Sequence, residues 1–203
     1  MKWAEGNLRE FPWRETTDPY KVCVAEIMLH QTFARKVAPI YEAVVRRYPD
    51  VVALSRARLP TLTKMLYPLG LIYRARTIKE MAKAVVKDHE GAFPTYKKGL
   101  LSLPGVGEYT ASAILCFAYG EQVPIIDANV VRVYARFLGL GLRLPRSSPS
   151  KEILEVAANA LPKGRAREFN YALLDFASVV CSHYNPKHAD CPVVTKCKYF
   201  NGK

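Results

Sequence analysis

Apolar residues recur at intervals of three and four along most of the chain, which is the spacing that places them on one face of an α-helix. In residues 76–91, Ile78, Met81 and Val85 share such a face, and Gly91 marks its end. The same spacing predicts further helices over residues 20–33, 34–48, 107–120, 127–140, 150–162 and 167–181. No stretch alternates apolar and polar residues convincingly, so we predict an all-α fold.

The length of the chain sets limits on its organisation. Its 203 residues, half of them apolar, are enough for one large domain or for two small ones. Residues 142–150, rich in proline and serine, are the best candidate for a loop or linker. No apolar run is long enough to span a membrane, and no secretory leader opens the chain. We therefore expect an intracellular protein without a membrane partner.

Charge indicates the class of partner. Lys and Arg number 30 and Asp and Glu 18, which gives a net charge of +12. A balance this basic favours a polyanionic partner, most often nucleic acid. The basic residues are spread along the chain and form no solid block, which is typical of a folded surface.

The five cysteines fall into two groups. Cys23 and Cys116 lie within apolar helical patterns and are expected in the core. Cys181, Cys191 and Cys197 crowd the C-terminal end. This asymmetry argues against a secreted disulfide framework and favours a metal site in a reducing compartment.

The stretch LPGVGEYT, at residues 103–110, begins a helix of small residues. Gly105 and Gly107 let the backbone turn sharply, and the helix that follows exposes its first N–H groups and the positive end of its dipole. Such a helix start can bind a phosphate oxygen. An ordinary corner between two helices would carry the same glycines, so both interpretations stay open here.

A second stretch, PIIDANVVRV, places Asp127 at the start of a predicted helix. An aspartate in this position is most often a helix cap. It can also stand beside a sugar and stabilise the positive charge that develops at the anomeric carbon, as the carboxylates of glycoside-cleaving enzymes do.

Taken in order, the motifs resemble the helix-hairpin-helix DNA glycosylases of the endonuclease III superfamily. The resemblance runs over nearly the whole chain, through FPWRETTDPYKVCVAEIMLHQT, GLIYRAR, LPGVGEYTASAIL, PIIDANVVRVYAR, FNYALLDFASVVC and the terminal cysteines. It implies a six-helix barrel domain at residues 15–121 and a second helical domain built from residues 1–14 and 122–203. A DNA cleft would lie between the two domains.

The resemblance also assigns roles to residues. Asp127 becomes the catalytic aspartate. The hairpin would grip the DNA backbone beside the lesion through Leu103, Gly105, Val106, Gly107 and Thr110. The implied partner is double-stranded DNA with a mismatched or damaged base, bound by a monomeric, DNA-associated enzyme.

Bifunctional members of the family carry a lysine where this chain has Tyr109. The lysine amine forms a Schiff base with the sugar and leads to strand cleavage, whereas a phenol cannot form an imine. We therefore expect Asp127 to steer water onto the sugar, cleavage of the base–sugar bond alone, and no strong lyase activity. Tyr109 would pack near the extruded nucleotide.

Chemistry on a base within a duplex requires that the base be flipped out. Gln31 stands where the family inserts a polar side chain into the vacated stack, and Leu71 where it inserts a wedge from the opposite side. Ala34, Asn129 and Tyr171 are expected near the pocket that receives the base.

Two types of relative share the PWR motif and a glutamate at Glu26: MutY-type adenine glycosylases and Mig-type thymine/uracil mismatch glycosylases. Glu26 could protonate adenine, whereas thymine or uracil leaves as an anion and needs hydrogen bonds to its carbonyl oxygens. Ala34, Ala128 and the non-aromatic Leu71 resemble the Mig type, and Tyr171 fits neither type.

The chain ends six residues after Cys197, without the extra C-terminal domain of the MutY type. We therefore predict removal of thymine or uracil opposite guanine. Adenine removal opposite 8-oxoguanine or guanine is the alternative, and a non-catalytic DNA-binding module is a third hypothesis.

The family holds a [4Fe–4S] cluster with the motif C-x6-C-x2-C-x5-C. Cys181, Cys191 and Cys197 occupy its first, third and fourth positions, and His188 occupies the second. Three thiolates and an imidazole can hold a [4Fe–4S] cluster, which is the first choice because the spacing is otherwise intact. The same set suits tetrahedral zinc, and a lost cluster is the remaining alternative.

Overall fold

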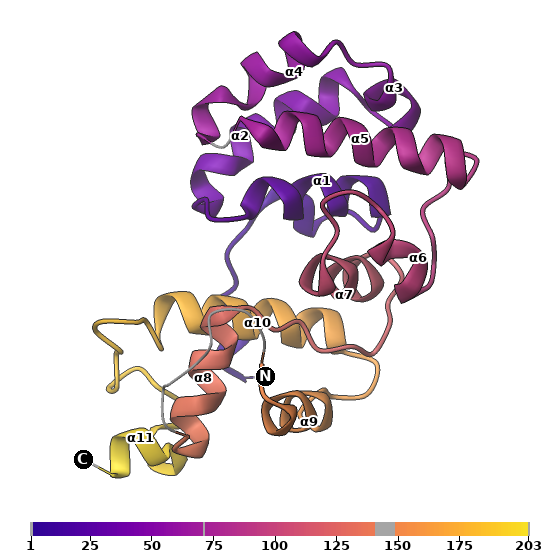
Figure 1. Ribbon diagram of the computed structural model, residues 1–203. Helices are drawn as coiled ribbons and strands as arrows, with labels where there is room; N and C mark the ends of the chain where they lie inside the picture. Colours follow the sequence, from indigo (N-terminus) through magenta and orange to yellow (C-terminus); the bar gives the residue numbers. More distant parts are fainter. Residues whose placement is uncertain (1, 71, 141–148, 203) are drawn as a thin grey trace. The chain divides into compact units, whose positions relative to one another are not determined.

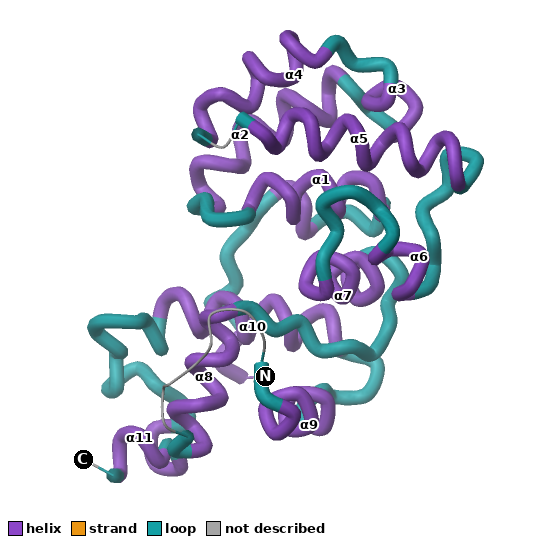
Figure 2. Tube along the Cα trace, viewed as in Figure 1, coloured by secondary structure: helices purple, strands orange, loops and turns teal. Residues whose placement is uncertain are grey.

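The computed structural model describes residues 2–70, 72–140 and 149–202. These residues form helices and connecting loops, with no strand among them, so the prediction of an all-α fold is confirmed (Figure 2). The chain divides into two compact units: Glu10–Gly120, the central unit, and Met1–Arg9 with Glu121–Lys203, the terminal unit. The sequence places these boundaries slightly later, at 14/15 and 121/122.

The central unit is built around α1 (Pro19–Leu29), which packs against α2, α5 and α7 (Figure 1). Val22, Cys23, Val24 and Met28 are each at most 2% exposed, so α1 is buried on several sides at once. The other helices of this unit are α2 (Ala34–Arg47), α3 (Val51–Ser55), α4 (Leu59–Leu66), α5 (Tyr73–Asp88), α6 (Lys97–Leu101) and α7 (Glu108–Phe117), with short 3-10 turns at Pro12–Arg14 and Tyr67–Leu69.

Helix boundaries in the central unit follow local capping groups. The Asp18 carboxylate accepts a hydrogen bond from the N–H of Tyr20 at the start of α1. Gly91, with a φ of +84°, follows α5 and donates its N–H to the carbonyl oxygen of Val85. The prediction of one helix over residues 20–33 is too long, because the backbone turns at residues 30–33 before α2 begins.

The helices of the terminal unit are α8 (Ala128–Leu138), α9 (Lys151–Asn159), α10 (Ala166–Val179) and α11 (Lys198–Asn201), with 3-10 turns at Lys2–Ala4 and Val194–Lys196. α8 packs against the other three. One apolar cluster joins α8 to α9 through Val130, Tyr134 and Ile153. A second cluster joins α8 to α10 through Val133 and Phe176.

The first nine residues belong to the terminal unit because they pack on α10. The Trp3 ring lies edge-on to the Phe176 ring, with centroids 5.4 Å apart. Arg9 Nε lies 2.6 Å from Asp175 Oδ1, and the Arg9 backbone N–H donates to Asp175 Oδ2 at 2.8 Å. The Asp175 side chain is fully buried, so this charged pair fixes the N-terminal segment in place.

Of the linker predicted at residues 142–150, only residues 149 and 150 belong to the described part. Within the described part, no helix is both long and apolar enough to cross a membrane.

Candidate functional site

Asp127 lies at the start of α8, and its carboxylate is held from two sides. Oδ1 accepts a hydrogen bond from the backbone N–H of Val130 at 2.7 Å, and Oδ2 accepts one from Asn129 Nδ2 at 2.8 Å. The residue is half-buried. Asp127 is thus the N-cap of α8, whose dipole stabilises a negative charge at this end. The cap geometry fixes a partly exposed carboxylate, which is also what a role beside a sugar requires.

Asn129 is oriented by Arg132, one turn further along α8. Arg132 Nη1 donates to Asn129 Oδ1 at 2.8 Å. Because a guanidinium can only donate, the amide oxygen of Asn129 must face Arg132 and its NH₂ group must face Asp127. Arg132 is 8% exposed and donates further to the carbonyl oxygens of Ala177 and Cys181, at 2.8 and 3.1 Å. Burial is the main cause that lowers the pKa of Arg132.

The segment that leads to Asp127 is held by α10. Asn170, which is 1% exposed, accepts a hydrogen bond from the N–H of Ile125 with Oδ1. Its Nδ2 donates to the carbonyl oxygen of Val123, and both distances are 3.0 Å. One buried amide therefore pairs with the backbone of this segment much as a neighbouring strand would. The position of Asp127 thus depends on α10 as well as on α8.

The residues predicted for the base pocket are divided between the units. Tyr171 on α10 is 7% exposed, and the Arg167 guanidinium carbon lies 5.9 Å from its ring centroid. Asn129 is exposed on α8. Ala34 is the first residue of α2 in the central unit and is partly exposed. Their assembly into one pocket stays a prediction.

The predicted hairpin is present in the central unit, where α6 and α7 are joined by residues 102–107. Leu103 and Val106 are buried and anchor the turn. Gly105 has a φ of +79°, and a Cβ atom there would lie 2.2 Å from Thr77 Cγ2 on α5. Gly107 is exposed, precedes α7 and leaves its N-terminus without a side-chain cap. The exposed glycines therefore make the backbone, rather than the apolar side chains, the available surface of the hairpin.

Thr110 faces the interior of the central unit. It is 1% exposed, and its Oγ1 lies 3.4 Å from Nε2 of His30, directly after α1. Burial, followed by the charge of Arg74, lowers the pKa of His30 and so favours the neutral ring. This contact joins the hairpin helix to the end of α1. Tyr109 beside it is partly exposed in the first turn of α7.

Glu26 lies in the middle of α1 and is 4% exposed. One turn earlier, burial raises the pKa of the Cys23 thiol, and the carboxylate of Glu26 raises it further. Cys23 and Cys116 are fully buried, as expected of core residues. The catalytic role of Glu26 stays a prediction.

Gln31 lies exposed in the turn between α1 and α2, with a φ of +53°. This left-handed conformation is uncommon for a residue other than glycine. Arg74, which is 1% exposed, holds the turn: its Nη1 donates to the carbonyl oxygen of Met28 and to Thr32 Oγ1, both at 2.8 Å. Gln31 is thus presented on a fixed turn. Leu71 lies outside the described residues.

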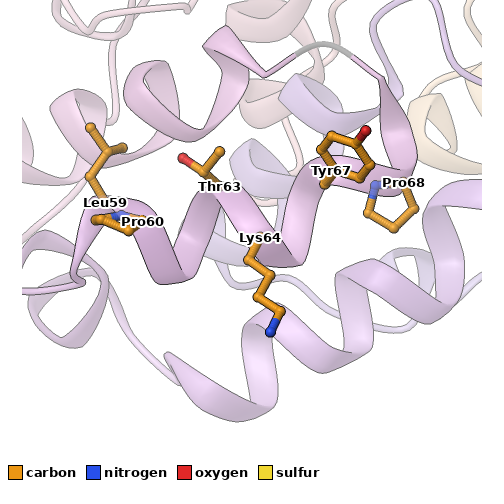
Figure 3. Close-up of a pocket in the computed structure, with 6 residues that line it drawn as sticks. All are labelled: Leu59, Pro60, Thr63, Lys64, Tyr67 and Pro68. Carbon is orange, nitrogen blue, oxygen red and sulfur yellow. The ribbon is translucent and has the colours of Figure 1, made fainter.

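The surface hollows among the described residues of the central unit include one along α4 and one beside the hairpin. One, of about 730 Å³, runs along α4 and contains none of the predicted site residues. Its lining residues are Leu59, Pro60, Thr63, Lys64, Tyr67 and Pro68 (Figure 3). The other, of about 440 Å³, is bordered by Gly105 of the hairpin, by His30 and by Arg74.

The C-terminal cysteines gather around the end of α8. Cys181 and Cys191 pack against the same apolar cluster of α8 and α10. Burial raises the pKa of Cys191, and the neighbouring Cys197 and Cys181 raise it further. The His188 ring lies against Phe200, with centroids 4.8 Å apart. In the part of the chain that is described, no three His, Cys, Asp or Glu residues form a group that could hold a metal ion.

Arg136 organises this cysteine segment. It is 5% exposed, and its guanidinium donates to the carbonyl oxygens of Ser182 and His183, both at 2.7 Å. Its Nη1 lies 3.5 Å from Cys181 Sγ, and its own carbonyl oxygen lies 3.6 Å from Cys197 Sγ. The first and last predicted sulfur ligands, Cys181 and Cys197, therefore both lie beside Arg136, and the metal site that would add Cys191 and His188 stays a prediction.

Sequence reasoning did not find Arg74, Arg132, Arg136 or Asn170. Each is a buried polar residue that joins segments far apart in the sequence. A signal was present for two of them, because Arg132 and Arg136 interrupt an otherwise apolar helix four residues apart. Buried arginines at this spacing indicate carbonyl oxygens that need donors.

Comparison with known proteins agrees with this arrangement. Residues 24–159 match the model of the HhH-GPD superfamily base excision DNA repair protein. The chain is 36% identical over 193 residues to a thymine/uracil-DNA glycosylase of Methanothermobacter thermautotrophicus, covering 95% of this chain and 87% of that protein. It is 34% identical over 194 residues to an adenine DNA glycosylase of Mycobacterium tuberculosis, covering 95% of this chain and 64% of that protein.

A solved structure gives the same result. The structure of a thermostable thymine-DNA glycosylase matches with a TM-score of 0.92 at 34% identity, covering 100% of this chain and 93% of that one. The family match spans well over half of the chain, and the fold and the curated relatives agree with it. The chain therefore belongs to the HhH-GPD superfamily of base excision DNA repair proteins.

Proposed function

We propose that this protein is a monofunctional DNA glycosylase that removes thymine or uracil mispaired with guanine from double-stranded DNA. The observation that carries the proposal is the carboxylate of Asp127, fixed and partly exposed at the start of α8. The family match and the glycosylase names of the relatives support the class of reaction.

Asp127 acts on the sugar of a flipped nucleotide. When the bond between C1′ and the base breaks, its electron pair leaves with the base, and positive charge grows on the deoxyribose ring. The carboxylate stabilises this charge, and because Val130 and Asn129 already hold it, no reorganisation is needed at that moment. Water then adds to C1′ and releases a proton to solvent, while the departing base takes up a proton.

The product is an abasic site in an intact strand. Strand cleavage in this superfamily's bifunctional members needs an amine that forms an imine with C1′. Tyr109 offers a phenol at that position of α7 and cannot do so. The expected reaction therefore stops after hydrolysis.

Adenine is the second candidate base, and the burial of Glu26 favours it. A buried carboxyl group, such as that of Glu26 in α1, is suited to deliver a proton to a purine ring. A thymine or uracil substrate would instead use such a group as a hydrogen-bond partner. Removal of adenine opposite 8-oxoguanine or guanine is therefore the alternative outcome of the test below.

Access to the base requires flipping, for which the turns of the central unit are suited. The hairpin presents exposed backbone at Gly105 and Gly107, where phosphate oxygens can bind. Gln31 would enter the vacated stack and Leu71 would press from the other side. Ala34, Asn129 and Tyr171 would border the base.

We also propose a [4Fe–4S] cluster held by Cys181, His188, Cys191 and Cys197. The spacing of the four positions in the sequence supports it, as do the Cys181 and Cys197 sulfur atoms, which lie 3.5 and 3.6 Å from Nη1 and from the carbonyl oxygen of Arg136. The cluster would fix the loop that carries Lys187 and Lys196 for contact with phosphates. Tetrahedral zinc on the same ligands is the alternative.

The experiment uses a panel of duplexes that carry G·T, G·U, A·8-oxoguanine or A·G. Each duplex is incubated with the full chain and analysed with and without hot alkali. Strand breaks on G·T and G·U that appear only after alkali are expected. Turnover on the adenine duplexes alone would assign the second candidate, and breaks without alkali would overturn the monofunctional assignment. Binding without turnover on any duplex would reduce the protein to a DNA-binding module.

A further inference from the structure

Phe33, which has no role in the reaction so far, is 87% exposed in the turn that carries Gln31. A phenylalanine ring has no polar atom, and burying one is normally favourable. It also occupies the N-cap of α2, where Ser, Thr, Asp or Asn is preferred and where its side chain makes no capping hydrogen bond. Neither solubility nor helix formation explains a phenylalanine here.

The backbone on both sides of Phe33 is fixed. The carbonyl oxygen of Phe33 accepts hydrogen bonds from the N–H groups of Lys36 and Val37, at 2.9 and 3.2 Å. Before it, the Thr32 N–H donates to Leu29 at 3.1 Å, and Thr32 Oγ1 accepts the hydrogen bond from buried Arg74. The backbone that carries the exposed ring is therefore fixed, so binding to the ring orders only its side-chain torsions and costs little backbone entropy.

The charges beside Phe33 point to an anionic partner. Arg35 and Lys36 follow it in the first turn of α2 and are exposed, and this turn contains no acidic residue. Positive charge at the N-terminus of a helix is unfavourable to the helix itself. Residues that are unfavourable for the local structure are expected at positions where function requires them. An exposed aromatic ring followed by two cations suits a nucleic-acid base followed by its phosphates.

We propose that Phe33 is a stacking platform for a DNA base that loses its stacking partner when the target nucleotide is flipped. The inference rests on the proposed function, because only flipping exposes such a base. Gln31, two residues earlier on the same turn, would enter the gap, while Phe33 would cover a base beside it. Arg35 and Lys36 would neutralise the adjoining phosphates. Stacking on Phe33 would then favour DNA with a flipped nucleotide, whereas the charges of Arg35 and Lys36 would contribute affinity for any duplex.

The test measures binding to two duplexes at one salt concentration: one with a tetrahydrofuran abasic analogue opposite guanine, and one fully paired. Phe33→Ala should weaken binding to the abasic duplex by roughly tenfold to a hundredfold, the usual loss for a removed stacking contact, and should leave the paired duplex within about twofold. Phe33→Trp should bind the abasic duplex at least as tightly as the parent.

Tyr67→Ala is the matched control, because Tyr67 is also an exposed aromatic residue, but it borders the α4 hollow that contains none of the predicted site residues and is followed by a proline rather than by basic residues. It should bind both duplexes as the parent does. Equal weakening on both duplexes, no weakening by Phe33→Ala, or failure of Phe33→Trp would each overturn the proposal. Equal unfolding midpoints for all variants exclude a loss of fold.

A fluorescent base identifies the occupant. 2-Aminopurine is placed either opposite the abasic analogue or next to it. The parent protein should quench the 2-aminopurine fluorescence at one of these positions, and Phe33→Ala should restore the fluorescence at that position. Quenching that Phe33→Ala leaves unchanged at both positions would also overturn the proposal. Because these readouts need no turnover, a protein that releases no base would refute the glycosylase function and still decide the role of Phe33.

Discussion

Asn129 Nδ2 donates a 2.8 Å hydrogen bond to Asp127 Oδ2, and the buried Arg132 determines which way the Asn129 amide points. The proposed catalytic carboxylate is therefore oriented by a chain of two side chains on α8, those of Asn129 and Arg132. Arg132 is itself bound to the carbonyl oxygens of Ala177 and Cys181, so the chain ends on the segment that carries the predicted metal ligands.

Asp127→Asn should lower the rate of base release by at least about a hundredfold, because it removes the negative charge that stabilises the sugar cation. Asparagine is an equally good N-cap, so α8 should keep its stability. Single-turnover rates and unfolding midpoints measure the two effects. Asp50→Asn is the control, since Asp50 caps α3 with a 2.7 Å hydrogen bond and has no proposed catalytic role. A fully active Asp127→Asn enzyme would refute the catalytic assignment.

Asn129→Leu should lower the rate of base release by roughly tenfold to a hundredfold, the expected effect of losing a hydrogen bond to a charged group. Asn129→Asp should do more, because a second carboxylate beside Asp127 favours protonation of the pair. When the pH is lowered, the Asn129→Asp variant should therefore lose its activity at a higher pH than the parent does. Ala128→Ser, at the adjacent exposed position, is the control. Identical pH–rate profiles for Asn129→Asp and the parent would contradict this coupling.

Gly105→Ala should destabilise the protein by about 2 kcal/mol or more, because its φ of +79° is unfavourable for alanine and the new Cβ would lie 2.2 Å from Thr77 Cγ2. Thr77→Ser removes that methyl group and should recover the steric part of the loss in the double variant. Gly107→Ala should cost less than Gly105→Ala, because a Cβ there meets nothing within 4 Å. Denaturant unfolding gives the free energy of unfolding of the parent, of Gly105→Ala, Thr77→Ser and Gly107→Ala, and of the Gly105→Ala/Thr77→Ser double variant. Equal losses for the two single glycine variants would contradict the packing of the hairpin on α5.

The pKa of His30, lowered by burial and by Arg74, gives a testable pH dependence of stability. Because the unfolded ring binds a proton at a higher pH than the folded ring, the stabilisation is complete above the ordinary value of about 6.5. It should fall as the pH drops below that value towards the lowered pKa. His30→Gln should remove this part of the pH dependence. Free energies of unfolding between pH 5 and 8 give the comparison, with His89→Gln, at a partly exposed position after α5, as control.

Cys191→Ser should remove the visible absorption of a bound [4Fe–4S] cluster, since a hydroxyl group replaces one of the proposed thiolate ligands. His188→Cys should keep the cluster and complete the four-cysteine motif. Cys116→Ser is the control for loss of a thiol, since Cys116 lies buried in α7. Zinc with no iron in the purified protein would assign the alternative metal, and equal absorption for parent and Cys191→Ser would exclude Cys191 as a ligand.

Periodicity was sufficient for longer helices such as α5 and α10, because their buried residues recur at intervals of three and four along the sequence. It missed α3, α4, α6 and α11, since helices of four to eight residues contain too few turns for a pattern. Asp127 could be predicted from the sequence because it is an acidic residue directly before a predicted helix. Asn170 could not, because its partners at Val123 and Ile125 lie more than forty residues away and are backbone groups.

The pairing of Arg9 with Asp175 has a consequence for biosynthesis. Because a chain is made from its N-terminus, residues 1–9 are made well before their partners on α10, and Asp175 lies 166 residues after Arg9. The helices of residues 10–120 meet all their mutual neighbours long before that point. Residues 1–9 can therefore dock only after α10 has been made, and this docking closes a loop that contains the whole central unit.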